Sequence, residues 1–216
     1  MGASRSARGD GRLARSINRN RHSESFVNVS SNLLRSRIPA LPASPEEVAE
    51  RLGRAGFTVS RVVPLAELLR AVVVGRVESV TQHPNADRLK VCSVDDGTEQ
   101  RLQIVTGADN VRADAFYPVI RGGTTLPNGT KIKRGKLRGE VSEGMLGSAD
   151  ELELGTDHAG LLTLHGELTP GTPLPDAIPV EGCVFVLDGN PELDKVVEAL
   201  GGPPAPPPVP AQSDAS

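Results

Sequence analysis

The sequence predicts a mainly β protein whose largest unit is a small barrel. Five runs rich in Val, Ile and other strand-forming residues follow one another at short spacing between residues 71 and 176, separated by turn residues. Only five of the 216 residues are aromatic and none is Trp, so the core must consist of Val, Leu, Ile and Ala. Five short strands joined by turns are typical of an OB-fold. We therefore expect a five-stranded OB-fold barrel, preceded by a small α+β module.

The N-terminal segment differs from the rest of the chain in charge. Residues 1–37 carry eight Arg against two acids, whereas the remainder carries 16 basic and 25 acidic residues. Residues 1–30 are rich in Arg and Ser and lack apolar periodicity, so we predict a disordered basic extension, because such a segment buries too little surface to offset its ordering entropy. An organelle transit peptide, a nucleic-acid-binding arm and a gene start assigned too far upstream all fit this composition.

Residues 31–70 are expected to form a small helix–strand module. Ser44 is a strong N-cap before a proline at the first helical position, and Glu47 completes a capping box. Gly56 then ends the helix, and residues 57–63 alternate and β-branch like a strand. This module contains no ionisable cluster, so it is expected to serve packing rather than chemistry.

Residues 71–176 are expected to form the barrel domain. The predicted strands lie at residues 72–80, 88–95, 101–106, 116–121 and 130–138, the last continuing toward 146. Turn sequences at 95–97 and 126–129 separate two pairs of these runs. A short helical stretch is expected at residues 149–154.

The C-terminal part is predicted to be simpler. Residues 177–202 are expected to be a short C-terminal extension with one amphipathic helix over 192–200, ended by a pair of glycines. Six of the last 14 residues are Pro, so residues 203–216 are predicted to be an extended, disordered tail.

Composition and spacing exclude several classes of function. No window approaches the ~20 apolar residues of a membrane-spanning helix. Cys92 and Cys183 lack C-x-x-C spacing and are predicted to be reduced core thiols in a cytosolic-type compartment. No metal-binding, nucleophile or phosphate-loop motif is complete, so we predict no catalytic residue, no metal and no cofactor. The chain is not expected to be an enzyme on its own.

Five cations within eight residues form the clearest candidate site: Lys131, Lys133, Arg134, Lys136 and Arg138. A regular strand would divide them between two faces, whereas a bulge at Gly135 would let most of them converge. Such clusters bind phosphates, because each contact releases counterions. The alternative is a solvated edge strand whose charges block aggregation. The pattern alone leaves both interpretations open.

Residues 83–89, His-Pro-Asn-Ala-Asp-Arg-Leu, form a second candidate segment directly after the first barrel strand. Pro84 and Asn85 predict a turn, which would place His83 and Arg88 at the rim of the barrel. Taken by spacing alone, a structural turn is favoured over a binding loop.

Five segments of the chain, in this order, match the pattern of a known family: residues 72–77 (VVVGRV), 83–91 (HPNADRLKV), 104–111 (IVTGADNV), 131–139 (KIKRGKLRG) and 142–146 (SEGML). They resemble the tRNA-binding OB-domain family, and the arrangement is most similar to the N-terminal region of the bacterial phenylalanyl-tRNA synthetase beta subunit. The resemblance covers about residues 31–176. The chain departs from it at Leu33 and Leu34, where the family usually has Trp, and at Thr106 and Gly147, where Cys is usual.

The resemblance implies a non-catalytic module that contacts the tRNA backbone through a basic barrel face. Its expected nucleic-acid-binding residues are Arg88, Lys131, Lys133, Arg134, Lys136 and Arg138, with His83, Asn85, Ser142 and Met145 nearby. The shortage of aromatics agrees with this, since it disfavours base stacking but not the reading of phosphate and shape.

The expected partners are tRNA and, as further candidates, a synthetase alpha subunit or a second copy of the chain. The expected location is the cytoplasm, or a mitochondrion or plastid if residues 1–30 are a transit peptide. Two alternatives remain open. The chain could be a protein-interaction or assembly domain, or a fragment of the beta subunit that contributes to phenylalanine–tRNA ligation within a larger complex.

Overall fold

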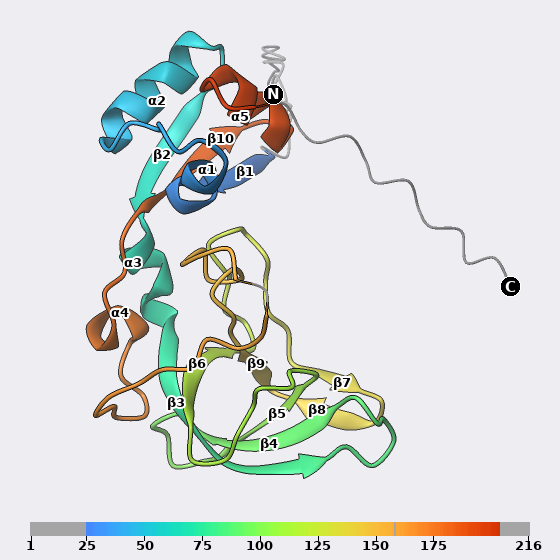
Figure 1. The fold of residues 1–216 in the computed structure, drawn as a ribbon. Helices are drawn as coiled ribbons and strands as arrows, with labels where there is room; N and C mark the ends of the chain where they lie inside the picture. Colours follow the sequence, from blue (N-terminus) through green and yellow to red (C-terminus); the bar gives the residue numbers. More distant parts are fainter. Residues whose placement is uncertain (1–24, 158, 204–216) are drawn as a thin grey trace, which may run out of the picture.

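The protein is mainly β: a three-stranded sheet lies at one end and a five-stranded barrel at the other, with a separate two-stranded hairpin beside the barrel (Figure 1). The computed structural model describes residues 25–157 and 159–203. The proposed basic extension up to residue 24 and the proline-rich tail from residue 204 lie outside the described residues. Within the described segments, no helix is both long enough and apolar enough to cross a membrane.

The first unit is a three-stranded antiparallel sheet with the order β1-β10-β2. Its strands are β1 (Phe26–Ser30), β2 (Val59–Pro64) and β10 (Cys183–Asp188). The helices packed on it are α1 (Ser31–Arg37), α2 (Pro45–Arg54) and α5 (Leu193–Ala199). Phe185 of β10 is fully buried between the sheet and these helices, together with Leu34 and Leu52.

Helix α2 begins where the sequence predicts. The Ser44 Oγ accepts a hydrogen bond from the Glu47 N–H at 3.4 Å, which satisfies one of the free amides of the first turn. The Glu47 carboxylate pairs with Arg51 at 2.8 Å instead of completing the capping box. Gly56 follows the helix with a φ of +91°, a conformation that glycine adopts without strain.

Two strands lie where the sequence predicts none. Residues 26–30 belong to the predicted disordered extension but form β1, because Val27 and Val29 alternate toward the helices and join the core. Strand β10 lies within the predicted C-terminal extension and forms the centre of the first sheet. Its five residues from Cys183 to Leu187 are all buried, so it lacks the alternation that marks a half-exposed strand. The division of the chain into domains remains a prediction.

The second unit is the predicted five-stranded antiparallel barrel, and it is consistent with an OB-fold. Its sheet has the order β5-β4-β3-β6-β9. The strands are β3 (Val72–Gln82), β4 (Lys90–Asp95), β5 (Leu102–Thr106), β6 (Phe116–Arg121) and β9 (Gly144–Leu146). A separate hairpin, β7 (Gly135–Leu137) and β8 (Glu140–Ser142), projects from its side in Figure 1.

The barrel is nearly closed between its two edge strands. The Glu143 N–H donates to the Gln103 carbonyl at 2.9 Å, just before β9 begins. Inside, β3 passes so close to its neighbours that a Cβ at Gly75 would lie 2.2 Å from Val119 Cγ2. A glycine is therefore required there for the strand to pack.

Short helices join the two units. The connections are α3 (Leu65–Leu68), the 3-10 turn η1 (Leu69–Ala71) and α4 (Leu174–Ala177). Leu65, Leu69 and Leu174 are fully buried in one cluster with Val184 of β10 and residues of β3 and β6. The sheet and the barrel therefore share part of their core.

The predicted strand at 130–138 is wrong in part. Residues 131–134 lie outside named strands, and Gly135 starts β7 in regular register with β8, with no bulge. The chain reverses at Arg138 and Gly139, whose φ angles are +50° and +105°, so a two-residue turn replaces a continuous strand.

The helix predicted at residues 149–154 is also wrong, because that stretch forms turns. The Glu151 carboxylate accepts from the Ser148 N–H at 3.0 Å, as in a capping box, so a helical turn can start here but does not continue. Glu153 then adopts a left-handed φ of +57°, which a helix does not tolerate.

Candidate nucleic-acid interface

An open groove on the barrel brings together half of the predicted site residues. It has a volume of about 580 Å³, and its lining includes five of them: Lys131, Lys133, Lys136, Ser142 and Met145. Val105 of β5, together with Ile132 and Leu137, adds an apolar part. The groove thus lies between the barrel edge and the segment that leads into the β7–β8 hairpin.

Four of the five clustered cations are available to an external partner. Lys131, Lys133, Lys136 and Arg138 are all exposed. No ion pair joins any of these four side chains to another residue of the described segments. Because neighbouring carboxylates do not neutralise them, their charge can act on a bound anion.

Arg134 is the exception among the five. Its guanidinium pairs with the Glu143 carboxylate at 2.7 Å, while the other oxygen of that carboxylate accepts from the Gln103 N–H at 3.0 Å. Glu143 is therefore anchored to β5 and fixes the direction in which Arg134 extends. An acid next to a basic segment indicates an orienting role rather than a phosphate contact, and the structure identifies Arg134 as the side chain that Glu143 orients.

Ser142 closes the barrel and does not face solvent. It is 5% exposed, and its Oγ accepts from the Val105 N–H at 3.1 Å and donates to the Gly144 carbonyl at 2.9 Å. Both hydrogen-bonding roles of the hydroxyl are thereby used inside the protein. Met145 is half-buried, lines the groove and also packs against the barrel core.

The 83–85 turn touches the tip of the β7–β8 hairpin. His83 is buried, and its Nε2 lies 2.9 Å from the Leu137 carbonyl oxygen. The Asn85 Nδ2 donates to the Arg138 carbonyl at 3.4 Å. The structure therefore brings His83 and Asn85 to the cation cluster. They contact the backbone carbonyls of the cluster and not its charged side chains.

Arg88 lies in the same loop and is exposed. No hydrogen bond or ion pair links its side chain to the groove within the described part of the chain. It is accessible but separate from the clustered cations.

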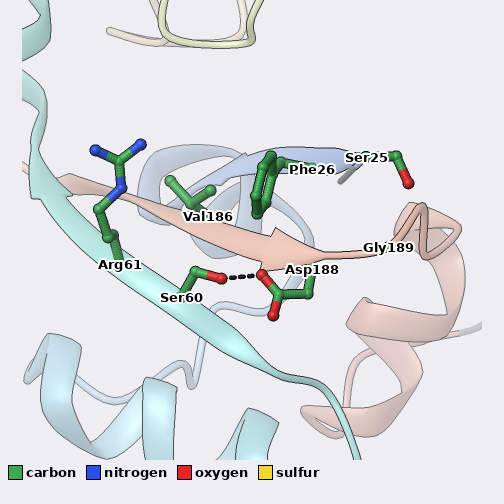
Figure 2. A pocket seen from close by; sticks show the side chains of 7 residues that line it. All are labelled: Ser25, Phe26, Ser60, Arg61, Val186, Asp188 and Gly189. Atoms are coloured by element: carbon green, nitrogen blue, oxygen red, sulfur yellow. Dashed lines mark hydrogen bonds between the residues drawn. The ribbon is translucent and has the colours of Figure 1, made fainter. Parts of the chain in front are cut away.

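A second hollow lies on the first sheet (Figure 2). Phe26, Val186 and Arg61 project from β1, β10 and β2 around a space of about 660 Å³. Ser60 donates a hydrogen bond to Asp188 at its border. This hollow contains none of the predicted site residues. Among the described residues, no cluster of His, Cys, Asp or Glu could hold a metal ion.

Comparison with known proteins assigns the barrel. The family model described as "Putative tRNA binding domain" matches residues 72–173, which include the barrel, the groove and the hairpin. Residues 72–173 belong to the tRNA-binding domain family. Every residue of the candidate interface lies within this match.

Curated relatives extend the similarity beyond the tRNA-binding domain. Three of them, each named phenylalanine–tRNA ligase beta subunit, match at comparable strength. The one from Bordetella pertussis is 44% identical over 156 residues, which is 72% of this chain and 19% of that protein. The one from Salinibacter ruber is 44% identical over 149 residues, 64% of this chain and 18% of that protein. The one from Oleidesulfovibrio alaskensis is 37% identical over 173 residues, 80% of this chain and 21% of that protein.

The tRNA-binding domain is thus related to phenylalanine–tRNA ligase beta subunits, and the chain spans about a fifth of the length of these relatives. Among solved structures, the C-terminal domain of Plasmodium vivax p43 aligns with a TM-score of 0.34 and 22% identity, covering 48% of this chain and 59% of that chain. This likeness is too weak to bear on the fold or the function of the chain.

Proposed function

We propose that this chain is a non-catalytic module that binds folded tRNA through its sugar–phosphate backbone. The observation that supports the proposal best is the groove, where exposed cations that pair with no carboxylate of the described residues lie within the segment that matches the tRNA-binding family. Each such cation that meets a phosphate releases counterions, which favours binding without reading sequence. The rest of the chain is acidic overall, so affinity must come from this local cluster.

The residues have different roles in the proposed complex. Lys131, Lys133, Lys136 and Arg138 would contact phosphates directly, while Glu143 holds Arg134 in a fixed direction beside them. Arg88 would contribute from the neighbouring loop. Ser142 would support the interface from inside the barrel, because its hydroxyl is already committed to two backbone groups.

Folded RNA is favoured over single strands as the ligand. Single-strand binders stack successive bases on aromatic rings, and the groove lining contains no aromatic residue among those described. RNA helices are instead recognised by shape, phosphate and 2′-hydroxyl groups, which suits a row of lysines.

The relatives' name supports a synthetase context for the module. We propose a synthetase alpha subunit as a candidate partner, with a second copy of the chain as the other, and the cytoplasm as the place of action. Light scattering after size exclusion, with and without an alpha subunit, tests the partner. A chain that elutes as a monomer in both cases would argue against either assembly.

The direct test of function compares two RNAs. At low salt, fluorescence anisotropy should show tighter binding to folded tRNA than to an unstructured single strand of equal length, with both affinities falling as salt rises. Absence of tRNA binding at low salt, or a preference for the single strand, would contradict the proposal.

A further inference from the structure

His83 is a polar residue buried in the candidate interface with both ring nitrogens occupied by protein groups. It is 3% exposed, so its ring cannot meet a macromolecule on the surface. Its Nδ1 accepts from the Asn85 N–H at 3.0 Å, and its Nε2 lies 2.9 Å from the Leu137 carbonyl oxygen. Since a carbonyl only accepts, the ring must carry its proton on Nε2 and donate it to Leu137. A neutral imidazole in this tautomer satisfies both contacts at once.

The partner of His83 is the last residue of a weakly supported strand. The β7–β8 hairpin has only three paired positions, and Leu137 is 44% exposed, so the hairpin has little apolar core of its own. Its turn also places Arg138 at a φ of +50°, where a side chain is strained. Contacts from outside must therefore hold the hairpin in place.

Those outside contacts come from two places on the barrel. On one side, Gln103 of β5 donates to the Val141 carbonyl at 2.9 Å and to Glu140 at 3.1 Å. On the other, the 83–85 turn contributes the His83 contact and the Asn85 contact to Arg138 at 3.4 Å. Of the contacts from this turn, the one from His83 is the shorter and is partly buried, whereas the one from Asn85 is exposed. The contact from His83 fixes the end of β7 between Lys136 and Arg138.

We propose that His83 is a positioning residue. Through its Nε2–H it holds the Leu137 carbonyl, and thereby sets the direction in which Lys136 and Arg138 meet RNA phosphates, without touching RNA itself. The expected effect on RNA binding rests on the proposed function, but the positioning of the hairpin can be measured in the free protein.

Two substitutions separate the two hydrogen bonds of the ring. His83→Asn keeps an acceptor that can bond the amide two residues on, as asparagine does in turns, but it is too short to reach Leu137. His83→Gln places an N–H near the position of Nε2 and keeps the contact with Leu137. If the ring positions the hairpin, His83→Asn should loosen it and His83→Gln should not.

The experiment measures amide hydrogen exchange of residues 135–142 in the free chain, and tRNA affinity at one low salt concentration. In His83→Asn, the hairpin amides should exchange about 2- to 10-fold faster, as expected for loss of one hydrogen bond, and tRNA affinity should fall by a similar factor. His83→Gln should stay within about 2-fold of the natural chain in both measurements. Asn85→Ala, which removes only the longer contact with Arg138, should loosen the hairpin less than His83→Asn.

Each other outcome has a distinct meaning. Unchanged exchange in His83→Asn would overturn the positioning role, whatever happens to affinity. Equal loss of affinity in the Asn and Gln variants with an unchanged hairpin would also overturn the positioning role, because the loss would not follow the contact with Leu137. A loosened hairpin in a protein whose natural form does not bind tRNA would leave the positioning intact and contradict the proposed function. If His83→Asn does not fold, the test uses Asn85→Ala. Unaltered amide exchange of the hairpin in that variant would show that the 83–85 turn does not hold the hairpin.

Discussion

Ser142 is a residue whose role in the interface is indirect. Its buried hydroxyl connects Val105 of β5 to Gly144 of β9, where the barrel closes. Replacing it by alanine leaves a buried N–H without its acceptor, and such a loss costs about 1–3 kcal/mol. Ser142→Ala should therefore lower the free energy of unfolding by that amount in urea titrations. Ser79→Ala, at an exposed position of β3, serves as the control and should change it by less than about 0.5 kcal/mol. Equal stability of the two variants would contradict the role of Ser142 in closure.

The two cysteines allow a pH prediction at the same scale. Burial raises the pKa of the Cys92 thiol to about 11, although Lys90 opposes the rise, and burial also raises the pKa of Cys183. Neither thiol should react with Ellman's reagent at pH 8 in the folded chain, and both should react once urea unfolds it. Since the raised pKa keeps the proton on the folded thiol, its contribution to stability is present below pH 9.0 and is lost as the pH rises toward about 11. Prompt labelling at pH 8 without denaturant would show that the thiols are not buried as described.

In the β7–β8 hairpin, a single substitution can remove a positive charge while keeping the turn. Its two-residue turn has positive φ at both Arg138 and Gly139, the geometry for which Asn-Gly is the favoured pair. Arg138→Asn should therefore keep or slightly strengthen the hairpin while removing one cation. If Arg138 contacts a phosphate, the slope of log affinity against log salt should become shallower by about 1. Arg138→Lys keeps the charge and should keep the slope. If the slope of log affinity against log salt in Arg138→Asn equals that of the natural chain, Arg138 does not contact a phosphate.

At the scale of the whole molecule, the chain leaves the first sheet, forms the barrel and returns to complete that sheet. Because β10 lies between β1 and β2, deletion of residues 183–203 should leave these two strands without a partner. The buried faces of Val29 and Leu52 would then be exposed. We expect limited proteolysis of the deletion variant to cut within residues 26–64, a region that should resist cleavage in the intact chain. Resistance of that region after the deletion would mean that residues 183–203 are dispensable to the first sheet.

The sequence predicts the barrel and the start of helix α2 well because their signals are local. Alternating strands, Ser44 before Pro45 and the turn at residues 126–129 each depend on neighbouring residues, and the Gly129 N–H indeed donates to the Leu126 carbonyl at 2.9 Å. Strand β10 was not predictable in this way, because a fully buried run has no alternation and its partners lie more than 100 residues away. The glycines that flank it, Gly182 and Gly189, were the available signal.

The same limit applies to the candidate site. The cluster of cations is visible in the sequence, and the groove is lined by all three of its lysines. The separation of roles is not visible in the sequence, because it depends on burial: His83 and Ser142 lie in motifs of the same family as the exposed cations but are turned inward. The pairing of Arg134 with Glu143 also joins residues whose proximity follows from the hairpin turn. Residue type thus identifies the region of the candidate site. Burial and hydrogen bonding then distinguish the exposed residues that can contact RNA from the buried residues that hold them in place.

The central claim is that the exposed cations of the groove bind tRNA phosphates. Its most direct test is the slope of log affinity for tRNA against log salt, compared between the natural chain and Lys131→Ala/Lys133→Ala/Lys136→Ala. A matched variant, Arg54→Ala/Arg61→Ala/Lys195→Ala, removes three exposed cations from the first unit. The account predicts a slope shallower by about 3 in the groove variant and an unchanged slope in the control. Equal slopes in the groove variant and the natural chain would contradict it.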